Sequence, residues 1–514
     1  MRRAVKIRVS SRNERLFPKF FGLSWRLCTS STAYRKIVSS TMLLLNIPPL
    51  LRSQPRTLLV PVFLLCIPLY ILLARASNGT RSRPWSPATQ PQSTALPANS
   101  TRLGSPECGD HFQADYLRTF VSRAAPYCNA ASTSRLTCLS HKIHEKWDVL
   151  CVTGPALLDA DKKSIELECT LRDWTEEDNA REIPPFTQFG MYWYNTGPRA
   201  IFKDFVHLSD SGEPDAVPTS TQAEGFSVLV RREDNSQNLW HTMMEIMSMT
   251  MSLDILRETM NLQTGRPFFT DKHVESTQVL ILDELPDGPY YDLWSLFAGR
   301  PPVRFSEMPS GSSTRTSLIF PLAGSSNPFW QAEWVKFNCG ESVLLKTFSR
   351  RVLEFYNISD NLPRSERQLV LTLIDRKEKR RLLHKAEYFD AVQAKFPDVL
   401  VQIVDFAELA LAEQIKVAHS TDILVGVHGA GLTHGIFLPP SSAVVEIQPP
   451  TLKHQGFDLM AQSLGHRYYG RHGSKHGSPD DNGDWQHDDV FVGRRVFLDV
   501  VSEAITNMQE LKPG

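Results

Sequence analysis

The chain has 514 residues, and its 56 Lys or Arg residues balance its 56 Asp or Glu residues, so the formal net charge is zero. This neutrality gives no support for a nucleic-acid partner, because proteins that bind nucleic acids carry a strongly basic surface. The length and the ordinary apolar content suffice for a large core or for two domains.

The N-terminal region predicts a basic cytosolic tail followed by a membrane anchor. Residues 1–56 hold twelve Lys or Arg against a single acid, Glu14. Residues 57–74 carry no charge, and they have about the length of the roughly 17–25 residues that a helix needs to cross a bilayer. The Lys/Arg excess before this segment favours a cytosolic N-terminus and a lumenal body. A cleaved signal peptide is the alternative, but the apolar run begins too far from Met1 for one.

The segment after the anchor, residues 75–104, predicts a disordered stem. It is rich in Pro, Ser, Thr and Asn and poor in large apolar residues, so it cannot bury enough surface to fold. Glycosylation sequons follow the apolar run at Asn78, Asn99 and Asn357 and none precedes it, which fits a lumenal body. We therefore expect a single-pass type II protein of the Golgi or endoplasmic reticulum membrane, with its catalytic domain in the lumen.

The cysteines agree with an oxidising compartment. Six of the eight follow the predicted anchor, and an even number there favours disulfides over a metal site. Buried free thiols are the alternative. The six are Cys108, Cys128, Cys138, Cys151, Cys169 and Cys339.

The body is predicted to be α/β, with two Rossmann-like domains that face each other across a cleft. Residues 105–220 mix short apolar runs with cysteines and allow no assignment. Beyond them, strands alternate with helices in two series, a pattern typical of parallel sheets covered by helices. The first series has strands at 226–232, 277–284 and 316–323 and helices at 237–256, 290–299 and 341–356. The second has strands at 367–375, 399–406, 422–429 and 443–449 and helices at 385–396 and 407–420. We place the domains at 105–360 and 361–470, with 471–514 as a C-terminal segment that returns to the body.

The stretch from Ile423 to Pro449, "ILVGVHGAGLTHGIFLPPSSAVVEIQP", suggests a ligand site. In parallel sheets, ligands bind beyond the carboxyl ends of the strands. Gly429 and Gly431 would let the backbone approach a ligand, and the N-terminus of a following helix would suit a phosphate. The alternative is a tight turn with buried core histidines. The glycine spacing is not the GxGxxG fingerprint of a dinucleotide site, which argues against a dehydrogenase.

Three stretches together resemble the family 61 glycosyltransferases. They are the 423–449 stretch, "NLWHTMMEI" from Asn238 and "RKEKRRLLH" from Arg376, within a match over roughly 226–449. The family includes plant β-1,2-xylosyltransferases and EGF-domain-specific O-linked N-acetylglucosamine transferases. The resemblance implies a GT-B fold and an inverting, metal-independent transfer of N-acetylglucosamine or xylose from a UDP-sugar to a glycan or glycoprotein acceptor. It implies no permanently bound cofactor.

The first motif holds the candidate catalytic residues. Asn238, His241 and Glu245 are spaced at i, i+3 and i+7, so they lie on one face of a helix. An amide, an imidazole and a carboxylate in a cleft could bind an acceptor hydroxyl and remove its proton. We expect Glu245 to be the base and His241 to orient the acceptor or the donor phosphate, although the family usually has Asp at position 245. The alternative is a solvated polar stripe opposite a Met-rich face.

The other two motifs hold the candidate UDP-sugar residues. Arg376 and Arg380 lie four residues apart, so both guanidinium groups could bind one diphosphate and stabilise the charge on the departing UDP. Their alternative is a solvated basic turn. The family has Asn where this chain has His384, which leaves a third contact open. Glu446 resembles the acid that binds ribose or sugar hydroxyls in GT-B enzymes, and His434 stands where many members have Asn. The full predicted set is Arg376, Arg380, His428, Gly429, Ala430, Gly431, His434 and Glu446.

Two other functions compete with this interpretation. A metal-dependent GT-A transferase would need an Asp-x-Asp motif, for which Asp159 and Asp161 or the acidic stretch 480–489 are the candidates. A catalytically inactive lumenal protein that binds nucleotide sugars or glycans is the second, suggested by the departures from the family pattern at Glu245 and His384.

Overall fold

The structure is a computed structural model that describes residues 106–143, 145–210, 225–233, 237–359, 367–474 and 484–511. The predicted tail, anchor and stem, at 1–56, 57–74 and 75–104, lie outside these residues. Among the helices that the structure describes, none combines the length and the apolar character that a bilayer crossing requires.

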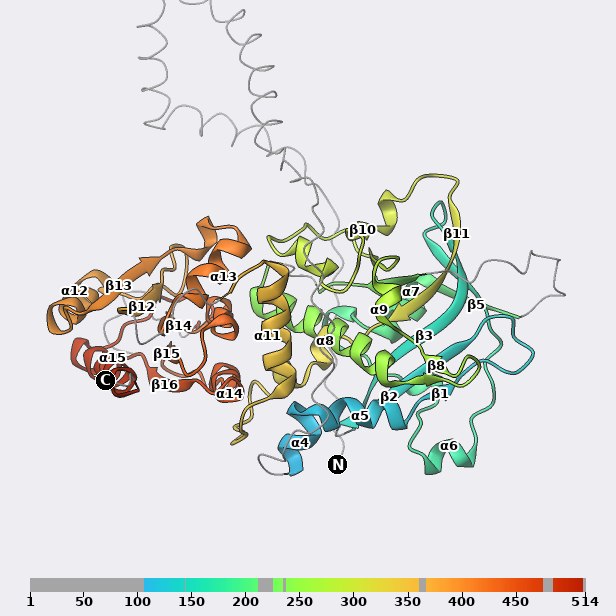
Figure 1. The fold of residues 1–514 in the computed structure, drawn as a ribbon, viewed down its shortest axis with the longest axis horizontal. Coiled ribbons are helices and arrows are strands. Elements are labelled where there is room, and N and C mark those ends of the chain that lie inside the picture. Colours follow the sequence, from blue (N-terminus) through green and yellow to red (C-terminus); the bar gives the residue numbers. More distant parts are fainter. Residues whose placement is uncertain are drawn as a thin grey trace, which may run out of the picture. The chain divides into compact units, whose positions relative to one another are not determined.

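A mixed sheet forms the N-terminal part of the body (Figure 1). Within the described residues its strands follow the order β1-β2-β3-β11-β6-β9-β10, with β4 beside β3 and β5 beside β4. The strands are β1 (Ala125–Pro126), β2 (Leu136–Ile143), β3 (Lys146–Asp159), β4 (Ser164–Glu168), β5 (Val206–Ser209), β6 (Phe226–Val230), β9 (Gln278–Ile281), β10 (Val303–Arg304) and β11 (Ser313–Phe320).

This sheet is Rossmann-like in one half only. The strands β11, β6, β9 and β10 pair in parallel. Three of them, β6, β9 and β11, overlap the strands predicted at 226–232, 277–284 and 316–323. The β2–β3 hairpin and the β3–β11 pair are antiparallel. Of these strands, β2 and β3 come from the segment 105–220, in which the sequence pattern allowed no assignment.

The prediction of disulfides is confirmed. The structure joins Cys108 to Cys339, Cys128 to Cys169, and Cys138 to Cys151, and all six cysteines are buried. The first bond joins helix α4 (Pro106–Phe112) to the segment before α11 across 231 residues, so it closes by far the longest loop of the three. A bond of this kind stabilises the fold chiefly by restricting the unfolded chain.

The second sheet is fully parallel and agrees with the predicted second series. Its order is β13-β12-β14-β15-β16, and all four pairings are parallel. The predicted strands match β12 (Leu369–Ile374), β13 (Val399–Val404), β14 (Ile423–Val427) and β15 (Ala443–Gln448), whereas the edge strand β16 (Arg467–His472) was not predicted.

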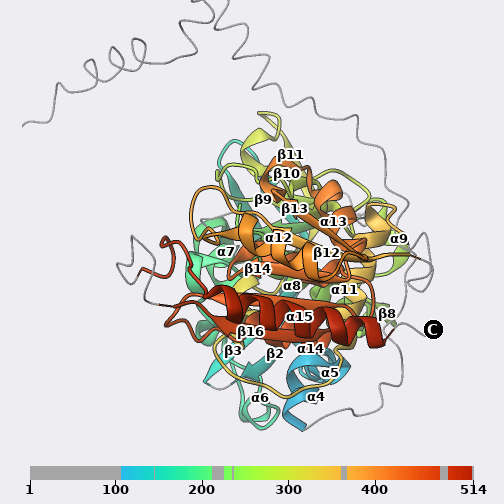
Figure 2. The same cartoon turned by 90° about the vertical axis from the view of Figure 1, so that its left-hand side faces the viewer.

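Alternate residues of these strands face two different layers, as the pleat of a strand requires. Ile423 and Val425 pack with helices α12 (Lys385–Lys395) and α15 (Arg494–Glu510), which cover the sheet face seen in Figure 2. Leu424 and Val444 belong instead to the large core cluster on the opposite face, which includes α13 (Leu411–His419), η8 (Ala430–Phe437) and α14 (Gly456–Ser463). A mixed α/β body of this kind fits a GT-B-like fold.

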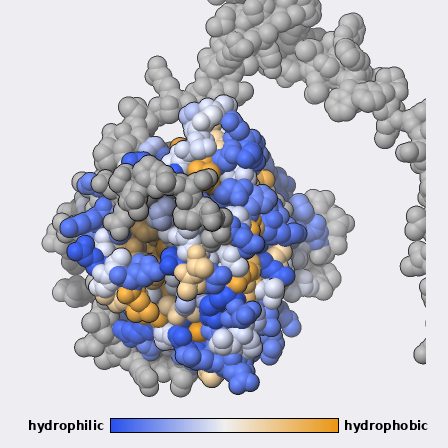
Figure 3. All heavy atoms as spheres, turned by 90° about the vertical axis from the view of Figure 1, so that its right-hand side faces the viewer, coloured by the Kyte–Doolittle hydropathy of each residue, from blue (hydrophilic) through white to orange (hydrophobic). Residues whose placement is uncertain are grey.

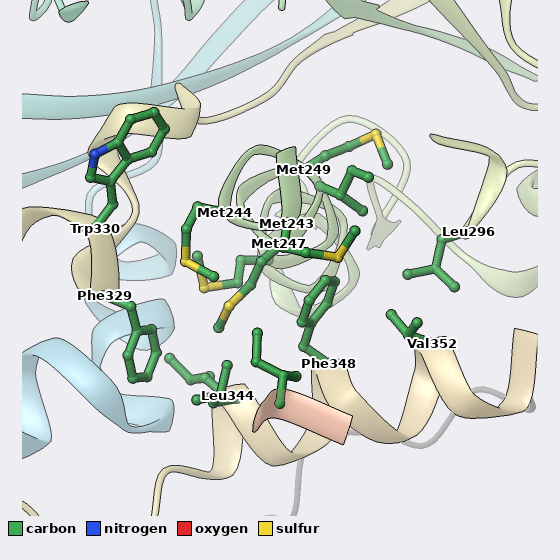
Figure 4. Packing of buried hydrophobic residues seen from close by; sticks show 14 of the residues in the cluster. Met243, Met244, Met247, Met249, Leu296, Phe329, Trp330, Leu344, Phe348 and Val352 are labelled. Carbon is green, nitrogen blue, oxygen red and sulfur yellow. The ribbon is translucent and has the colours of Figure 1, made fainter. Parts of the chain in front are cut away.

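Helix α8 (Leu239–Glu258) is a core helix, buried on nearly all sides. Its methionines Met243, Met244 and Met247 pack among Phe329 of α10 (Pro328–Gln331) and Leu344, Phe348 and Val352 of α11 (Val343–Phe355), as Figure 4 shows. Unbranched methionine fills such irregular gaps well. The alternative of a solvated polar stripe opposite the methionines is therefore wrong, because Glu245 is buried and His241 is partly buried.

Shorter elements complete the described part. The helix predicted at 290–299 is a 3₁₀ turn, η3 (Tyr291–Ser295), and the helix predicted at 407–420 divides into η7 (Phe406–Glu408) and α13. On the side shown in Figure 3, hydrophilic residues cover most of the described surface and apolar ones form scattered groups. The remaining short helices and strands of the described part are α5 (Ala114–Ser122), α6 (Glu176–Ala180), η1 (Phe186–Gln188), η2 (Trp193–Asn195), α7 (Pro198–Phe205), β7 (Met260–Asn261), β8 (Arg266–Pro267), α9 (Asp271–Val274), η4 (Phe305–Glu307) and η5 (Gly324–Ser326).

Candidate active site

Two arginines meet at the carboxyl ends of the neighbouring parallel strands β12 and β14. Arg376 follows β12 by two residues, and His428 and Gly429 directly follow β14. Gly429 has φ of 145°, and a Cβ atom there would lie 2.5 Å from Nη1 of Arg376 and 3.1 Å from Nη1 of Arg380. Glycine is therefore required at this position, because both guanidinium groups lie against its backbone.

The two guanidinium groups are half-buried and have no acidic partner in the described part of the chain. Arg376 Nε donates to the carbonyl of Lys379 (3.0 Å), and Arg380 Nη1 donates to the carbonyl of His428 (3.2 Å). Burial lowers the pKa of both, and the charge of Arg376 helps to lower the pKa of Arg380 to about 10. Two adjacent positive charges that are partly withdrawn from water are unfavourable unless an anion joins them. The arrangement suits a bound polyanion.

The other basic residues around this motif behave differently. Lys377 pairs with Asp375 at 2.6 Å, and Lys385 binds the same carboxylate. Arg381 pairs with Asp489 through its Nε and Nη2 atoms. The alternative of a uniformly solvated basic turn therefore does not describe Arg376 and Arg380, because these two are less exposed than Lys377, Lys379 and Arg381 and lack a carboxylate among the described residues.

His428 is held from behind by Glu446. Nδ1 of His428 lies 2.5 Å from Oε1 of Glu446, whose other oxygen accepts from the Tyr468 hydroxyl and from Gln448 Nε2. Glu446 is 0% exposed and His428 is 4% exposed, and burial lowers the pKa of His428. Glu446 thus fixes the orientation of the His428 ring. Its predicted role, binding ribose or sugar hydroxyls, stays a prediction.

The remaining predicted residues of this loop pack η8 against the sheet. A Cβ atom on Gly431 would lie 3.1 Å from Ile374 Cγ2, and Ala430 packs at the edge of the core cluster. His434 is buried, with Nδ1 bonded to the Gly431 carbonyl and Nε2 bonded to Gln414 Oε1 (2.7 and 2.8 Å). Both ring nitrogens of His434 are therefore used inside the protein, and its predicted contact with UDP-sugar stays untested.

The burial of His434 predicts a loss of stability in acid. Burial lowers the pKa of His434 from 6.5 to about 4. Because the folded pKa is depressed, the contribution is fully present above about pH 6.5 and is lost as the pH falls through about 4. His434→Asn does not titrate, so its free energy of unfolding should fall less than that of the parent over this range, by up to about 3 kcal/mol. Urea unfolding from pH 7 to pH 4 measures this difference, and parallel curves for the two proteins would contradict it.

Asn238 caps helix α8. Its side-chain oxygen accepts from the backbone N–H of Trp240 (3.1 Å), which satisfies one of the unpaired donors of the first turn. The structure therefore gives Asn238 a local structural contact, and its predicted catalytic role stays untested.

Glu245 lies deeper in the core than a solvent-facing base would. It is 5% exposed, and its Oε1 accepts from the backbone N–H of Glu233 (3.0 Å). Burial, together with the negative charge of Glu233, raises its pKa well above the usual range. It lines a small cavity of about 20 Å³ with residues of the η5 loop, where a Cβ atom on Gly324 would lie 2.1 Å from Glu245 Cγ. The proton of Glu245 is thus retained to a higher pH than that of an exposed carboxyl.

His241 occupies a more open position one helical turn earlier. Its ring stacks on Trp330 (4.3 Å between centroids, 21° between planes), and the ring centroid of Tyr194 lies 5.8 Å away. Its Nδ1 atom bonds with the carboxylate of Glu233, and 19% of the side chain is exposed. Glu233 was not singled out from the sequence. The one sequence feature that could have identified it is its position three residues beyond the parallel strand β6, because ligands bind at the carboxyl ends of such strands.

One aromatic ring joins the two groups of residues. Phe457 of α14 has its ring centroid 5.5 Å from that of Trp240 and 5.5 Å from that of His428. The first turn of α8 and the loop after β14 therefore lie on either side of a single phenylalanine. The structure brings the predicted catalytic helix and the predicted phosphate loop together.

The candidate metal ligands lie in ordinary polar contacts. Asp159 pairs with Lys162, and Asp161, in the turn between β3 and β4, accepts from the backbone N–H of Gly311. From the acidic stretch 480–489, the residues 480–483 lie outside the described part, and Asp489 binds Arg381.

Comparison with known proteins defines the class of the domain that holds this site. Residues 239–445, which include α8, both arginines and the loop after β14, match the Glycosyltransferase 61 family model. The resemblance drawn from the motifs is thus confirmed over these residues, and the match supports a glycosyltransferase.

Three proteins that are similar to this chain carry the same name. The EGF domain-specific O-linked N-acetylglucosamine transferases of Canis lupus familiaris and Bos taurus are each 38% identical to this chain over 111 residues, which is 21% of this chain and 21% of the relative. The protein of that name from Drosophila melanogaster is 27% identical over 222 residues, or 42% of this chain and 40% of the relative. The aligned part therefore spans only about a fifth of the two mammalian relatives.

Proposed function

We propose that the protein is an inverting, metal-independent glycosyltransferase that moves a sugar from a UDP-sugar to a glycan or glycoprotein acceptor. The observation that carries this proposal is the pair Arg376 and Arg380, half-buried against Gly429 without a carboxylate partner among the described residues. Charged hydrogen bonds from guanidinium groups fit the diphosphate of a nucleotide sugar. In the transition state they would stabilise the charge that builds on the departing UDP.

For the donor sugar we propose N-acetylglucosamine, with xylose as the second possibility. The relatives named above are N-acetylglucosamine transferases, and xylose follows from the wider family resemblance. The same relatives are named for EGF domains, which supports a glycoprotein as the acceptor.

For the base we propose His241, which reverses the order expected from the sequence. An inverting transfer needs a group that accepts the proton of the acceptor hydroxyl as it attacks the anomeric carbon. Glu245 is 5% exposed, and burial together with the charge of Glu233 raises its pKa, so it is a less accessible base than the imidazole of His241. The His241 side chain is 19% exposed, and Glu233 holds its Nδ1 side. Such a carboxylate–imidazole pair favours the protonated imidazole that forms during transfer.

The function is tested by UDP release from the purified full-length protein. We expect release from UDP-N-acetylglucosamine that rises when a glycoprotein acceptor is added and that persists in EDTA, because the arginines supply the positive charge. UDP-xylose and UDP-glucose serve as donor controls. Loss of turnover on chelation, restored by manganese, would revive the metal-dependent mechanism with Asp159 and Asp161.

A catalytically inactive binding protein is the second candidate. The chain departs from the family pattern at Glu245 and His384, and His384 has a left-handed backbone (φ 58°) at the start of α12. The same assay separates the two candidates. A binding protein would bind UDP but would not form UDP from UDP-N-acetylglucosamine when acceptors are added.

We also propose that the body lies in the lumen of the Golgi or endoplasmic reticulum, behind the predicted single-pass anchor. Three disulfides and the exposed sequon residue Asn357 support an oxidising, glycosylating compartment. Protease treatment of sealed vesicles tests this, because complete digestion of the body would contradict it.

A further inference from the structure

A tryptophan that no motif contains lies beside the two arginines. Trp485 is partly buried, and its ring lies 5.9 Å from the guanidinium carbon of Arg380. It also meets the ring of His428 edge-on, with 5.8 Å between centroids. Trp485 therefore lies beside Arg380 and beside His428 in the loop after β14, although it is more than 50 residues away from each in the sequence.

The segment that carries Trp485 is fastened to the arginine loop. The backbone N–H of Arg380 donates to the carbonyl of His487 (3.4 Å), and the backbone N–H of Arg381 donates to Asp489 Oδ1 (2.9 Å). Further on, Val490 donates to the carbonyl of Arg381 and Leu383 donates to the carbonyl of Val490 (2.9 and 3.0 Å). The loop that positions Arg380 thus also positions Trp485.

We propose that Trp485 is the platform on which the nucleobase of the donor stacks, a role that rests on the proposed function. In a nucleotide sugar, the ribose separates the base from the diphosphate, so a base platform must stand beside the phosphate site and not within it. Trp485 stands there, next to Arg380 and still partly open to solvent. An indole presents the largest aromatic face among the side chains, and every base has a face that stacks on it. Trp485 therefore contributes affinity for nucleotides, whichever base they carry.

The competing role for Trp485 is to brace Arg380 by a cation–π contact, without touching the base. The two roles differ in what happens to a ligand that has a diphosphate and no base. Inorganic pyrophosphate is such a ligand. A platform affects UDP only, whereas a brace affects UDP and pyrophosphate alike.

The test measures the affinity of the full-length protein for UDP and for pyrophosphate by calorimetry. Trp485→Ala should weaken UDP binding by about 10- to 100-fold and leave pyrophosphate binding unchanged, while Trp485→Phe should retain most of the UDP affinity. Trp193→Ala is the matched control, since Trp193 is 68% exposed in η2, and it should change neither affinity. Thermal unfolding checks each variant, and Trp485→Phe keeps the comparison valid if the Ala variant does not fold.

Each other outcome overturns the platform in a recognisable way. Equal losses for UDP and pyrophosphate in Trp485→Ala would make Trp485 a brace. Unchanged UDP affinity in that variant would remove it from the site. A parent protein that binds neither ligand would instead refute the proposed function, and the platform with it.

Discussion

Replacing Arg376 and Arg380 together by Ala should abolish measurable UDP binding and leave the folded protein as stable as the parent. Losing a hydrogen bond to a charged group costs about 1.5–3 kcal/mol, so each single variant should bind UDP about 10- to 100-fold more weakly. Stability should not fall, because within the described part of the chain the two guanidinium groups donate hydrogen bonds to backbone carbonyls only, and they repel each other. Calorimetry with UDP and thermal unfolding of the same samples measure both quantities.

Lys379→Ala is the control for this experiment. Lys379 lies in the same basic stretch but is exposed, and an exposed charge is largely screened by water and salt. It should bind UDP nearly as well as the parent. Full UDP affinity in the double Arg variant would place both arginines outside the ligand site, and a large loss of stability would show that their main role is structural.

The second sheet could be predicted because its pattern is local. Continuous apolar runs such as 423–427 alternate with helical stretches, and buried parallel strands leave that signature in the sequence. The N-terminal sheet lacks it. Its central hairpin, β2 and β3, is antiparallel, is pinned by the bond between Cys138 and Cys151, and pairs with β11 from over 150 residues away. A local sequence pattern cannot indicate that two strands so far apart in the sequence pair with each other.

The site divides in the same way. Arg376, Arg380 and Gly429 were predicted, because motif spacing and the rule of carboxyl strand ends both point to them. Glu233, Trp330 and Trp485 were not, since each lies in a loop, a turn or a four-residue helix, which are too short to show a periodic pattern. They lie at the site only because the tertiary fold brings them into contact with His241 of α8 or with His428 after β14. The spacing of Asn238, His241 and Glu245 also predicted that they belong to one helix. It could not show that Glu245 is buried in the core.

The burial of Glu245 leads to the sharpest test of the catalytic proposal. His241→Ala should lower turnover by about 10²–10⁴-fold, the usual contribution of a general base, while UDP affinity stays unchanged. Glu245→Gln should retain most of the turnover, because Glu245 is buried and because burial and the charge of Glu233 favour its neutral form, which Gln resembles. Steady-state turnover of UDP-N-acetylglucosamine with an acceptor, together with UDP binding, measures both variants.

Two further variants complete this test. Asn238→Asp keeps an acceptor for the Trp240 N–H and so preserves the helix cap, and it should retain turnover if Asn238 is structural. Glu233→Gln keeps the shape of the partner of His241 but removes its charge. Because that charge would stabilise the imidazolium that forms during transfer, its loss should lower turnover while UDP affinity stays unchanged. A dead Glu245→Gln beside an active His241→Ala would restore the order expected from the sequence, with Glu245 as the base.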